Sequence, residues 1–277
     1  MKNTVVTFRA AKGQDKLVVL TAYDYSTARV MDDAGVNALL VGDSLGMVML
    51  GHEDTLSVSM DDMIRHCAAV ARAADQALVI CDMPYMSYHT SVDEAVRNAG
   101  RLVTEGRAQA VKLEGGSEFC DVVKALVRAS IPVMGHLGLT PQSVNAFGGF
   151  RMQGKTPSAA QKLLDDARAL QDAGAFALVL ECVPAPLAER VTQALAIPVI
   201  GIGAGAGCDG QVLVWQDMTG MTLSHLPRFV KRFGEVGASL RSAVEAYARE
   251  VRAGAFPTDD HGYPLPEGME KTLKKLK

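Results

Sequence analysis

Four short, almost wholly apolar runs, each followed within two residues by a carboxylate, constrain the fold of this chain more than any other feature. Continuous apolar runs of this length are typical of strands buried on both faces. A carboxylate at the tip of a buried strand costs several kcal/mol of desolvation free energy unless a cation or a donor receives its charge. Four such tips therefore predict a site where strand ends converge. The runs and their carboxylates are 38–41 with Asp43, 77–81 with Asp82, 110–113 with Glu114 and 177–180 with Glu181.

Helix signals separate these runs, so that strands and helices alternate along the chain. Ser59 with Asp62 and Ser91 with Glu94 resemble capping boxes, and Ser26 or Thr27 can cap an earlier helix. The other expected strands are 17–24, 131–136, 197–205 and 211–217. The expected helices end near 35, 74, 105, 129, 173, 195, 233 and 252, the last two (226–233 and 237–252) closing the domain. Residues 137–156 form the longest irregular stretch, and a loop of this length is usually functional or disordered.

This alternation predicts a parallel sheet with right-handed crossovers. Eight strands in this rhythm favour a closed (β/α)8 barrel over an open doubly wound sheet. The 277 residues fit one barrel domain, 1–277, with a polar C-terminal tail from about 257. In such barrels the active site lies at the C-terminal ends of the strands, where the four carboxylates are expected.

Composition excludes several classes of partner. The net charge is −3 and no basic block lies inside the folded region, which argues against nucleic acid. No apolar run approaches the roughly 18 residues of a membrane span, and residues 1–16 lack a signal peptide, so we expect a cytosolic protein. The five scattered cysteines, with no C-x-x-C, form neither a disulfide framework nor a zinc site.

Asp43, Asp82 and Glu114 end three successive strands, which are neighbours in a barrel. Because adjacent strands are about 5 Å apart, three carboxylates can surround one hard cation. Magnesium takes oxygen ligands and typically binds through one or two carboxylates, water and substrate. Each carboxylate alone could instead cap a helix or pair with a lysine, but the three together favour a metal site.

Three further side chains suit catalysis or binding. Lys112 lies two residues before Glu114 on one strand, so both side chains point the same way. Lys112 suits an anionic substrate, and the nearby carboxylates disfavour a Schiff-base role because they keep its ammonium charged. His136 ends the fifth strand and either bonds substrate or is a satisfied structural residue. Glu181, farther round the barrel from the metal site, is the candidate general base.

The glycine-rich segment 201–210 fits G-x-G-x-x-G at Gly205, Gly207 and Gly210. A strand rather than a helix follows it, so the dinucleotide fingerprint fails its structural context. Close approach to a ligand, or tight packing at the turn, are the better interpretations.

Several longer motifs are specific enough to compare with known families. They are VGDSLGM at 41–47, KLEGG at 112–116, GHLGLTPQS at 135–143, ECVP at 181–184, IGIGAG at 200–205 and DGQVLV at 209–214. Together they resemble the 3-methyl-2-oxobutanoate hydroxymethyltransferase (ketopantoate hydroxymethyltransferase) family. The resemblance covers essentially the whole chain, with small departures around Leu50 and 57–59.

The resemblance implies a cytosolic enzyme of pantothenate and coenzyme A biosynthesis with a (β/α)8 barrel of the phosphoenolpyruvate/pyruvate type. The enzyme would transfer a hydroxymethyl group from 5,10-methylenetetrahydrofolate to 3-methyl-2-oxobutanoate, giving 2-dehydropantoate by way of an enolate. It would use one Mg²⁺ per subunit and assemble as a homo-oligomer, usually a decamer. Glu181 would be the proton acceptor. The metal ligands would be Asp43, Asp82 and Glu114. The substrate contacts would be Asp43, Ser44, Asp82 and Lys112, to which we add His136 because of its position.

Two other functions remain open. The first is a magnesium-dependent C–C lyase or mutase of the same superfamily, whose members typically use a cysteine in a mobile loop; residues 137–156 contain no cysteine. The second is a barrel retained as a scaffold, which predicts eroded strand tips, whereas all four carboxylates are present.

Overall fold

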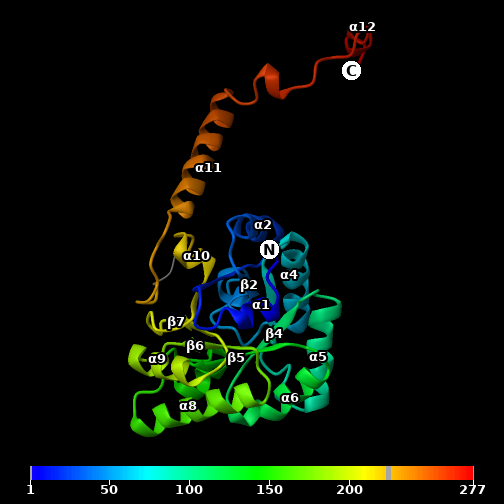
Figure 1. The fold of residues 1–277 in the computed structure, drawn as a ribbon. Helices are drawn as coiled ribbons and strands as arrows, with labels where there is room; N and C mark the ends of the chain where they lie inside the picture. Colours follow the sequence, from blue (N-terminus) through cyan, green and yellow to red (C-terminus); the bar gives the residue numbers. More distant parts are fainter. Residues whose placement is uncertain (1, 223–225, 277) are drawn as a thin grey trace.

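The computed structural model, which describes residues 2–222 and 226–276, contains a closed barrel of eight parallel strands in the order β1 to β8 (Figure 1). The predicted (β/α)8 barrel is therefore confirmed. The strands are β1 Leu17–Thr21, β2 Ala38–Val41, β3 Leu78–Asp82, β4 Ala110–Glu114, β5 Val133–Gly138, β6 Ala177–Glu181, β7 Val199–Ile202 and β8 Gly210–Leu213. Met1, 223–225 and Lys277 belong to the predicted single domain but lie outside the described residues, and that domain boundary stays a prediction.

Several helices begin directly after a residue whose side chain caps them. Ser59 and Asp62 form a reciprocal capping box, and Ser91 accepts a hydrogen bond from the Glu94 amide, as predicted. The first crossover helix begins earlier than predicted, because its N-cap is Asp24, which accepts from the Thr27 amide at 2.9 Å. The strand predicted at 17–24 is accordingly shorter, since β1 ends at Thr21. The α-helices are α1 Val5–Ala10, α2 Tyr25–Asp33, α3 Leu45–Val48, α4 Met60–Ala73, α5 Val92–Thr104, α6 Cys120–Arg128, α7 Val144–Phe147, α8 Pro157–Asp172, α9 Ala185–Ala194, α10 Trp215–Met218, α11 Val236–Ala253 and α12 Glu270–Leu273; the 3-10 turns are η1 Ser117–Phe119, η2 Pro141–Ser143 and η3 Asp259–His261.

Two apolar cores hold the barrel together. One lies between the strands and the surrounding helices, and the other fills the barrel interior with side chains from alternate strand positions. Phe8 of α1 closes the N-terminal end of the interior and packs edge-on against Phe176, with ring centroids 5.9 Å apart. The interior is thus sealed at one end and available at the other.

Some predicted boundaries are wrong. β5 begins after Pro132 and continues to Gly138, so His136 lies inside the strand and not at its end. The strands predicted at 197–205 and 211–217 are shorter, because Gly203 turns the chain at φ +63° and α10 follows β8. Residues 226–233, all described, form a turn at Arg228 and Phe229 and not a helix.

The last long helix does not close the barrel as predicted. α11 projects away from the strands and carries α12 at its far end (Figure 1). None of its residues is buried. Among the described residues, the model contains no helix with the length and hydropathy required of a membrane span.

Candidate active site

The strand register brings the predicted polar residues together at the open end of the barrel. Asp82 is paired with Lys112 across β3 and β4, and Glu114 with His136 across β4 and β5. The side chains of these four residues point into the barrel, as do those at alternate positions earlier in the same strands. The earlier inward-pointing residues are apolar and fill the barrel interior. Parallel strands end at one edge, so the polar tips share one space.

That space is a cavity of about 860 Å³. Its polar lining contains every predicted site residue, Asp43, Ser44, Asp82, Lys112, Glu114, His136 and Glu181. Its apolar lining includes Leu40, Val179, Ile202, Phe150 and Phe229. A pocket of this size, largely apolar with a few convergent polar groups, is the usual form of a small-molecule site.

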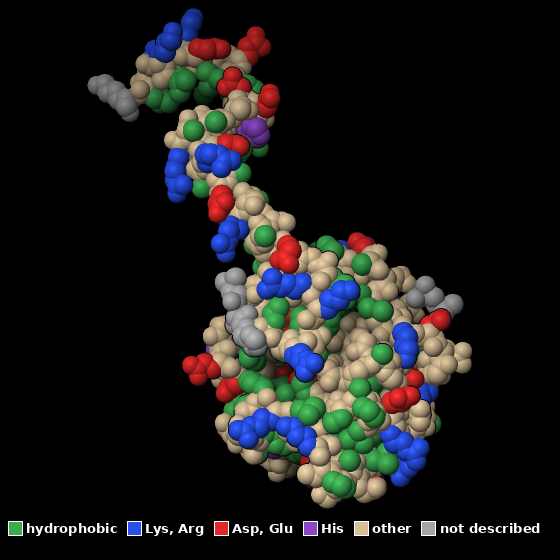
Figure 2. All heavy atoms as spheres, turned by 90° about the vertical axis from the view of Figure 1, so that its left-hand side faces the viewer, with side chains coloured by type: hydrophobic (Ala, Val, Ile, Leu, Met, Phe, Trp, Pro, Cys, Tyr) green, Lys and Arg blue, Asp and Glu red, His purple; other side chains and the backbone are tan. Residues whose placement is uncertain are grey.

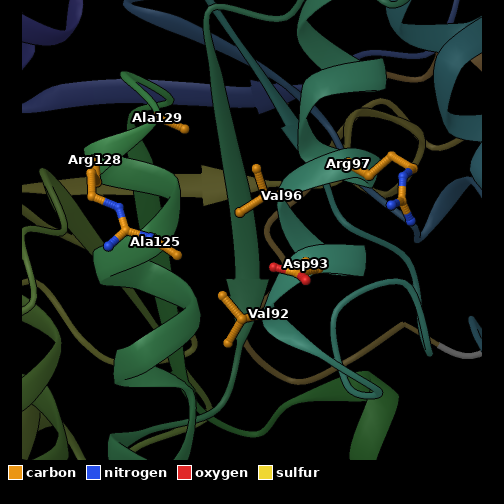
Figure 3. A pocket seen from close by; sticks show the side chains of 7 residues that line it. All are labelled: Val92, Asp93, Val96, Arg97, Ala125, Arg128 and Ala129. Carbon is orange, nitrogen blue, oxygen red and sulfur yellow. The ribbon is translucent and has the colours of Figure 1, made fainter.

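A second hollow, of about 450 Å³, lies outside the barrel between α5 and α6 (Figure 3). Val92, Val96 and Ala125 line it together with Asp93, Arg97 and Arg128. It has no cluster of buried titratable groups, so the cavity at the strand ends is the candidate active site.

Three buried carboxylates line one side of the cavity. The Asp43 amide donates to Asp82 Oδ2 at 3.1 Å, which places the two side chains next to each other. Burial, together with repulsion from Asp82, raises the pKa of Asp43 well above its usual range. Burial likewise raises the pKa values of Asp82 and Glu114, although Lys112 opposes the rise in both. These carboxyl groups lack enough positive charge around them.

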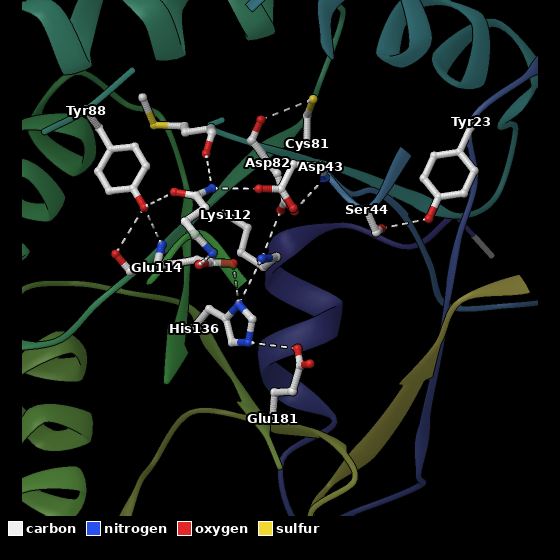
Figure 4. A network of polar contacts seen from close by, with 12 residues as sticks. Tyr23, Asp43, Ser44, Cys81, Asp82, Tyr88, Lys112, Glu114, His136 and Glu181 are labelled. Carbon is white, nitrogen blue, oxygen red and sulfur yellow. Dashed lines mark hydrogen bonds and ion pairs between the residues drawn. The ribbon is translucent and has the colours of Figure 1, made fainter. Parts of the chain in front are cut away.

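Lys112 is the buried cation of the site, with its Nζ 3.1 Å from Asp82 Oδ1 (Figure 4). Burial lowers its pKa, but the charges of Asp82, Glu114 and Asp43 outweigh burial, and the pKa is raised overall. Lys112 is therefore expected to stay an ammonium, in keeping with the prediction that it binds an anion and does not form a Schiff base.

His136 connects Lys112 to Glu181. Its Nδ1 lies 3.1 Å from Lys112 Nζ and its Nε2 3.3 Å from Glu181 Oε2 (Figure 4). Burial, and then Lys112, lower the pKa of His136, so the ring is neutral. An ammonium can only donate, so we assign the ring proton to Nε2, facing Glu181. Glu181, with 17% of its side chain exposed, is thus linked to the carboxylate cluster through one imidazole.

The donor set fits a divalent cation that also binds substrate. Within 2–222 and 226–276, no three His, Cys, Asp or Glu side chains are arranged so that they could hold a metal ion by themselves, so substrate and water would have to complete the coordination. Asp82 Oδ1 is nevertheless buried with no aligned hydrogen bond, only the Lys112 contact. Asp43, Asp82 and Glu114 with Lys112 leave two negative charges in excess when ionised, the charge that one Mg²⁺ would balance.

Ser44 and the glycine-rich segment follow the sequence analysis in part. The Ser44 hydroxyl lines the cavity and lies 2.8 Å from the Tyr23 hydroxyl. The glycines serve tight packing: a Cβ on Gly203 would lie 2.7 Å from the Phe229 ring, and one on Gly205 2.4 Å from the Ala185 Cβ. A strand, β8, begins at Gly210, so no helix follows the motif.

Sequence reasoning assigned no role to three buried polar side chains of the site, Tyr23, Tyr88 and Gln142. Gln142 and Tyr88 contact the candidate metal ligands directly. The only available signal was that Gln142 lies within the motif 135–143, since neither residue type indicates metal chemistry.

Solved structures similar to this one define the class to which the fold belongs. They include 2,3-dimethylmalate lyase, a PEP mutase/isocitrate lyase superfamily member (TM-score 0.58, 18% identity, 99% of both chains), and phosphonopyruvate hydrolase (TM-score 0.61, 14% identity, 98% and 95%). These likenesses place the fold in the class of closed (β/α)8 barrels that these enzymes share.

The family within this class follows from closer relatives. The family model described as ketopantoate hydroxymethyltransferase matches residues 2–259. The 3-methyl-2-oxobutanoate hydroxymethyltransferase of Enterococcus faecalis is 58% identical to this chain, over 100% of both chains. The 3-methyl-2-oxobutanoate hydroxymethyltransferase of Clostridium novyi is also 58% identical, over 97% of this chain and 98% of the relative. The chain belongs to the ketopantoate hydroxymethyltransferase family of enzymes.

Proposed function

We propose that this enzyme transfers a hydroxymethyl group from 5,10-methylenetetrahydrofolate to 3-methyl-2-oxobutanoate and so forms 2-dehydropantoate. The observation that carries the proposal is the arrangement of one cavity: a buried ammonium, three carboxylates and, on the opposite wall, a partly exposed carboxylate, Glu181. A small 2-keto acid needs a cation for its carboxylate, an electrophile for its ketone and a base for C3. The cavity has a candidate for each.

Asp43, Asp82 and Glu114 would hold one Mg²⁺ per subunit. The metal would act as a Lewis acid toward the ketone oxygen and so acidify the C3 proton. The protein supplies the remaining groups. Lys112, kept charged by the carboxylates, balances the substrate carboxylate. Ser44 offers a hydroxyl to the substrate, fixed in direction by Tyr23.

Glu181 would take the C3 proton. It lies at the end of β6 on the cavity wall, and its partial exposure leaves an oxygen accessible to substrate. His136 Nε2 faces the other oxygen at 3.3 Å, and its one N–H would donate instead to a substrate oxygen that gains charge where the substrate takes the place of Glu181 beside the ring. The apolar walls suit the isopropyl group of the keto acid and, farther out, the folate.

Cytoplasmic location is part of the proposal. All five cysteines are free in the structure, and free cysteines are typical of reducing compartments.

A homo-oligomer is a further part of the proposal, and the resemblance to the family suggests a decamer. What supports it is α11, part of the extension that stands away from the barrel (Figure 2), because its exposed apolar side chains recur at helical spacing. These side chains are Val236, Leu240, Val244, Tyr247 and Val251. An apolar helix face of this length usually contacts a partner, and closed symmetric assemblies are the commonest form of soluble homo-oligomers.

Charges on the apolar face of α11 should dissociate the assembly. We expect wild type to scatter light as a multiple of the 29.4 kDa chain, and Leu240→Asp with Val244→Asp to give a smaller mass. Ser242→Asp, on the opposite face of α11, is the matched control. A wild-type mass near 29.4 kDa at micromolar concentration would refute the oligomer.

Proton exchange tests the proposed chemistry without folate. In deuterated water with Mg²⁺, the wild-type enzyme should exchange the C3 proton of 3-methyl-2-oxobutanoate, and a chelator should abolish the exchange. NMR follows the loss of the C3 proton signal. Exchange that is absent, or unchanged by the chelator, would contradict the proposed metal-assisted proton abstraction.

A further inference from the structure

Gln142 bonds three strand ends of the active site at once. It lies in η2, after β5, and is 6% exposed. Its Nε2 donates to Asp43 Oδ2 at 2.7 Å and to the Met83 carbonyl at 3.0 Å, while its backbone amide donates to Glu114 Oε2 at 2.9 Å. One residue therefore connects the ends of β2, β3 and β4.

Tyr88 determines how the Gln142 amide faces. The Tyr88 hydroxyl, buried like its ring, donates to Gln142 Oε1 at 2.7 Å and accepts from the Glu114 amide at 3.1 Å. A flipped Gln142 amide would place its oxygen against the Asp43 carboxylate and the Met83 carbonyl and its NH₂ against the Tyr88 hydroxyl, so both bonds that Nε2 donates would be lost. All donors and acceptors of the amide are used in the observed orientation.

Gln142 holds one oxygen of each carboxylate and so fixes the direction of the other. Asp43 Oδ2 accepts from Gln142, which leaves Oδ1 for another partner. Glu114 Oε2 accepts from the same residue, which turns Oε1 toward the His136 ring, 3.2 Å from its Nδ1. Neutral donors fix these directions without adding a charge to a site that lacks positive charge.

We propose that Gln142, oriented by Tyr88, is a positioning residue that fixes which oxygens of Asp43 and Glu114 face the divalent cation. The inference rests on the proposed function, since it presumes that these carboxylates bind Mg²⁺. Its physical basis is that hydrogen-bond partners of metal ligands set ligand direction, and their loss commonly weakens metal binding about 10–100-fold.

Calorimetric titration with MgCl₂, in the presence of 3-methyl-2-oxobutanoate, tests this role. Gln142→Ala should weaken Mg²⁺ binding about 10–100-fold, and Tyr88→Phe should weaken it in the same direction by less. Tyr88→Phe keeps the ring packed against Phe119, at a centroid distance of 5.1 Å, and so preserves the fold. Gln153→Ala, in the same loop but outside the cluster, should bind Mg²⁺ like wild type.

A split between metal affinity and catalytic rate separates positioning from a merely structural role. For Gln142→Ala, a higher Mg²⁺ concentration should restore most of the turnover. For Tyr88→Phe, the melting temperature measured without metal should stay near that of wild type. Wild-type Mg²⁺ affinity in both variants would overturn the inference and leave the proposed function intact. A wild-type enzyme that binds no Mg²⁺ with the keto acid would overturn both.

Discussion

Replacing Glu181 with glutamine is expected to lower the rate of 2-dehydropantoate formation by about 10²–10⁴-fold, the usual contribution of a positioned general base. The variant keeps the size of the side chain and an oxygen that can face His136 Nε2, so the cavity should keep its shape. Glu181 is not among the buried carboxylates beside Lys112. Binding of Mg²⁺ and 3-methyl-2-oxobutanoate should therefore change little.

Two measurements separate the base from the binding groups. Calorimetry of Glu181→Gln should give near wild-type affinity for the keto acid, while NMR in deuterated water should show that most C3 proton exchange is lost. Glu189→Gln, an exposed change on α9, is the matched control and should exchange normally. Exchange by Glu181→Gln at the wild-type rate would show that Glu181 is not the base, and His136 would become the next candidate.

Replacing Asp82 with asparagine should affect binding rather than the base. The substitution removes the charge that faces Lys112 at 3.1 Å and one of two adjacent carboxylates expected to hold Mg²⁺. Loss of one partner from a buried ion pair commonly lowers folding stability by about 3–5 kcal/mol, so the melting temperature of the variant should also fall. Because a metal ligand is lost, we expect Mg²⁺-dependent binding of the keto acid to weaken by more than the about 10–100-fold that follows loss of a ligand's hydrogen-bond partner.

The same titrations test the role of the metal in wild type. Keto-acid affinity should fall when Mg²⁺ is removed by a chelator, and turnover should stop. Asp121→Asn is the control, because its side chain is 87% exposed on α6. If wild type bound the keto acid equally well with and without Mg²⁺, the metal-chelate account would be refuted.

The barrel was predictable because its strands are buried on both faces. Such strands appear in the sequence as continuous apolar runs, and the alternation with capped helices then limits the topology. The period of two along a strand also placed Lys112 and Glu114 on one side correctly, as both line the cavity. Spacing therefore predicted that the four carboxylates, Lys112 and His136 meet at one end of the barrel, whereas Ser44 was added only by the resemblance to the family.

Other parts depend on tertiary contacts that no local pattern records. Gln142 and Tyr88 come from loops, and their role follows only from how those loops fold over the carboxylates. α11 has the periodicity of a helix packed on a core, and this periodicity predicts its apolar face but not the surface that covers it. The predicted helix at 226–233 failed because a helical pattern over a short stretch containing Pro227 is weak evidence.

Product formation tests the central claim most directly. The purified enzyme should convert 3-methyl-2-oxobutanoate to 2-dehydropantoate when Mg²⁺ and 5,10-methylenetetrahydrofolate are both present, as detected by mass spectrometry. Omission of any one component should abolish the product. An enzyme that binds both substrates and Mg²⁺ but yields no 2-dehydropantoate would contradict the account.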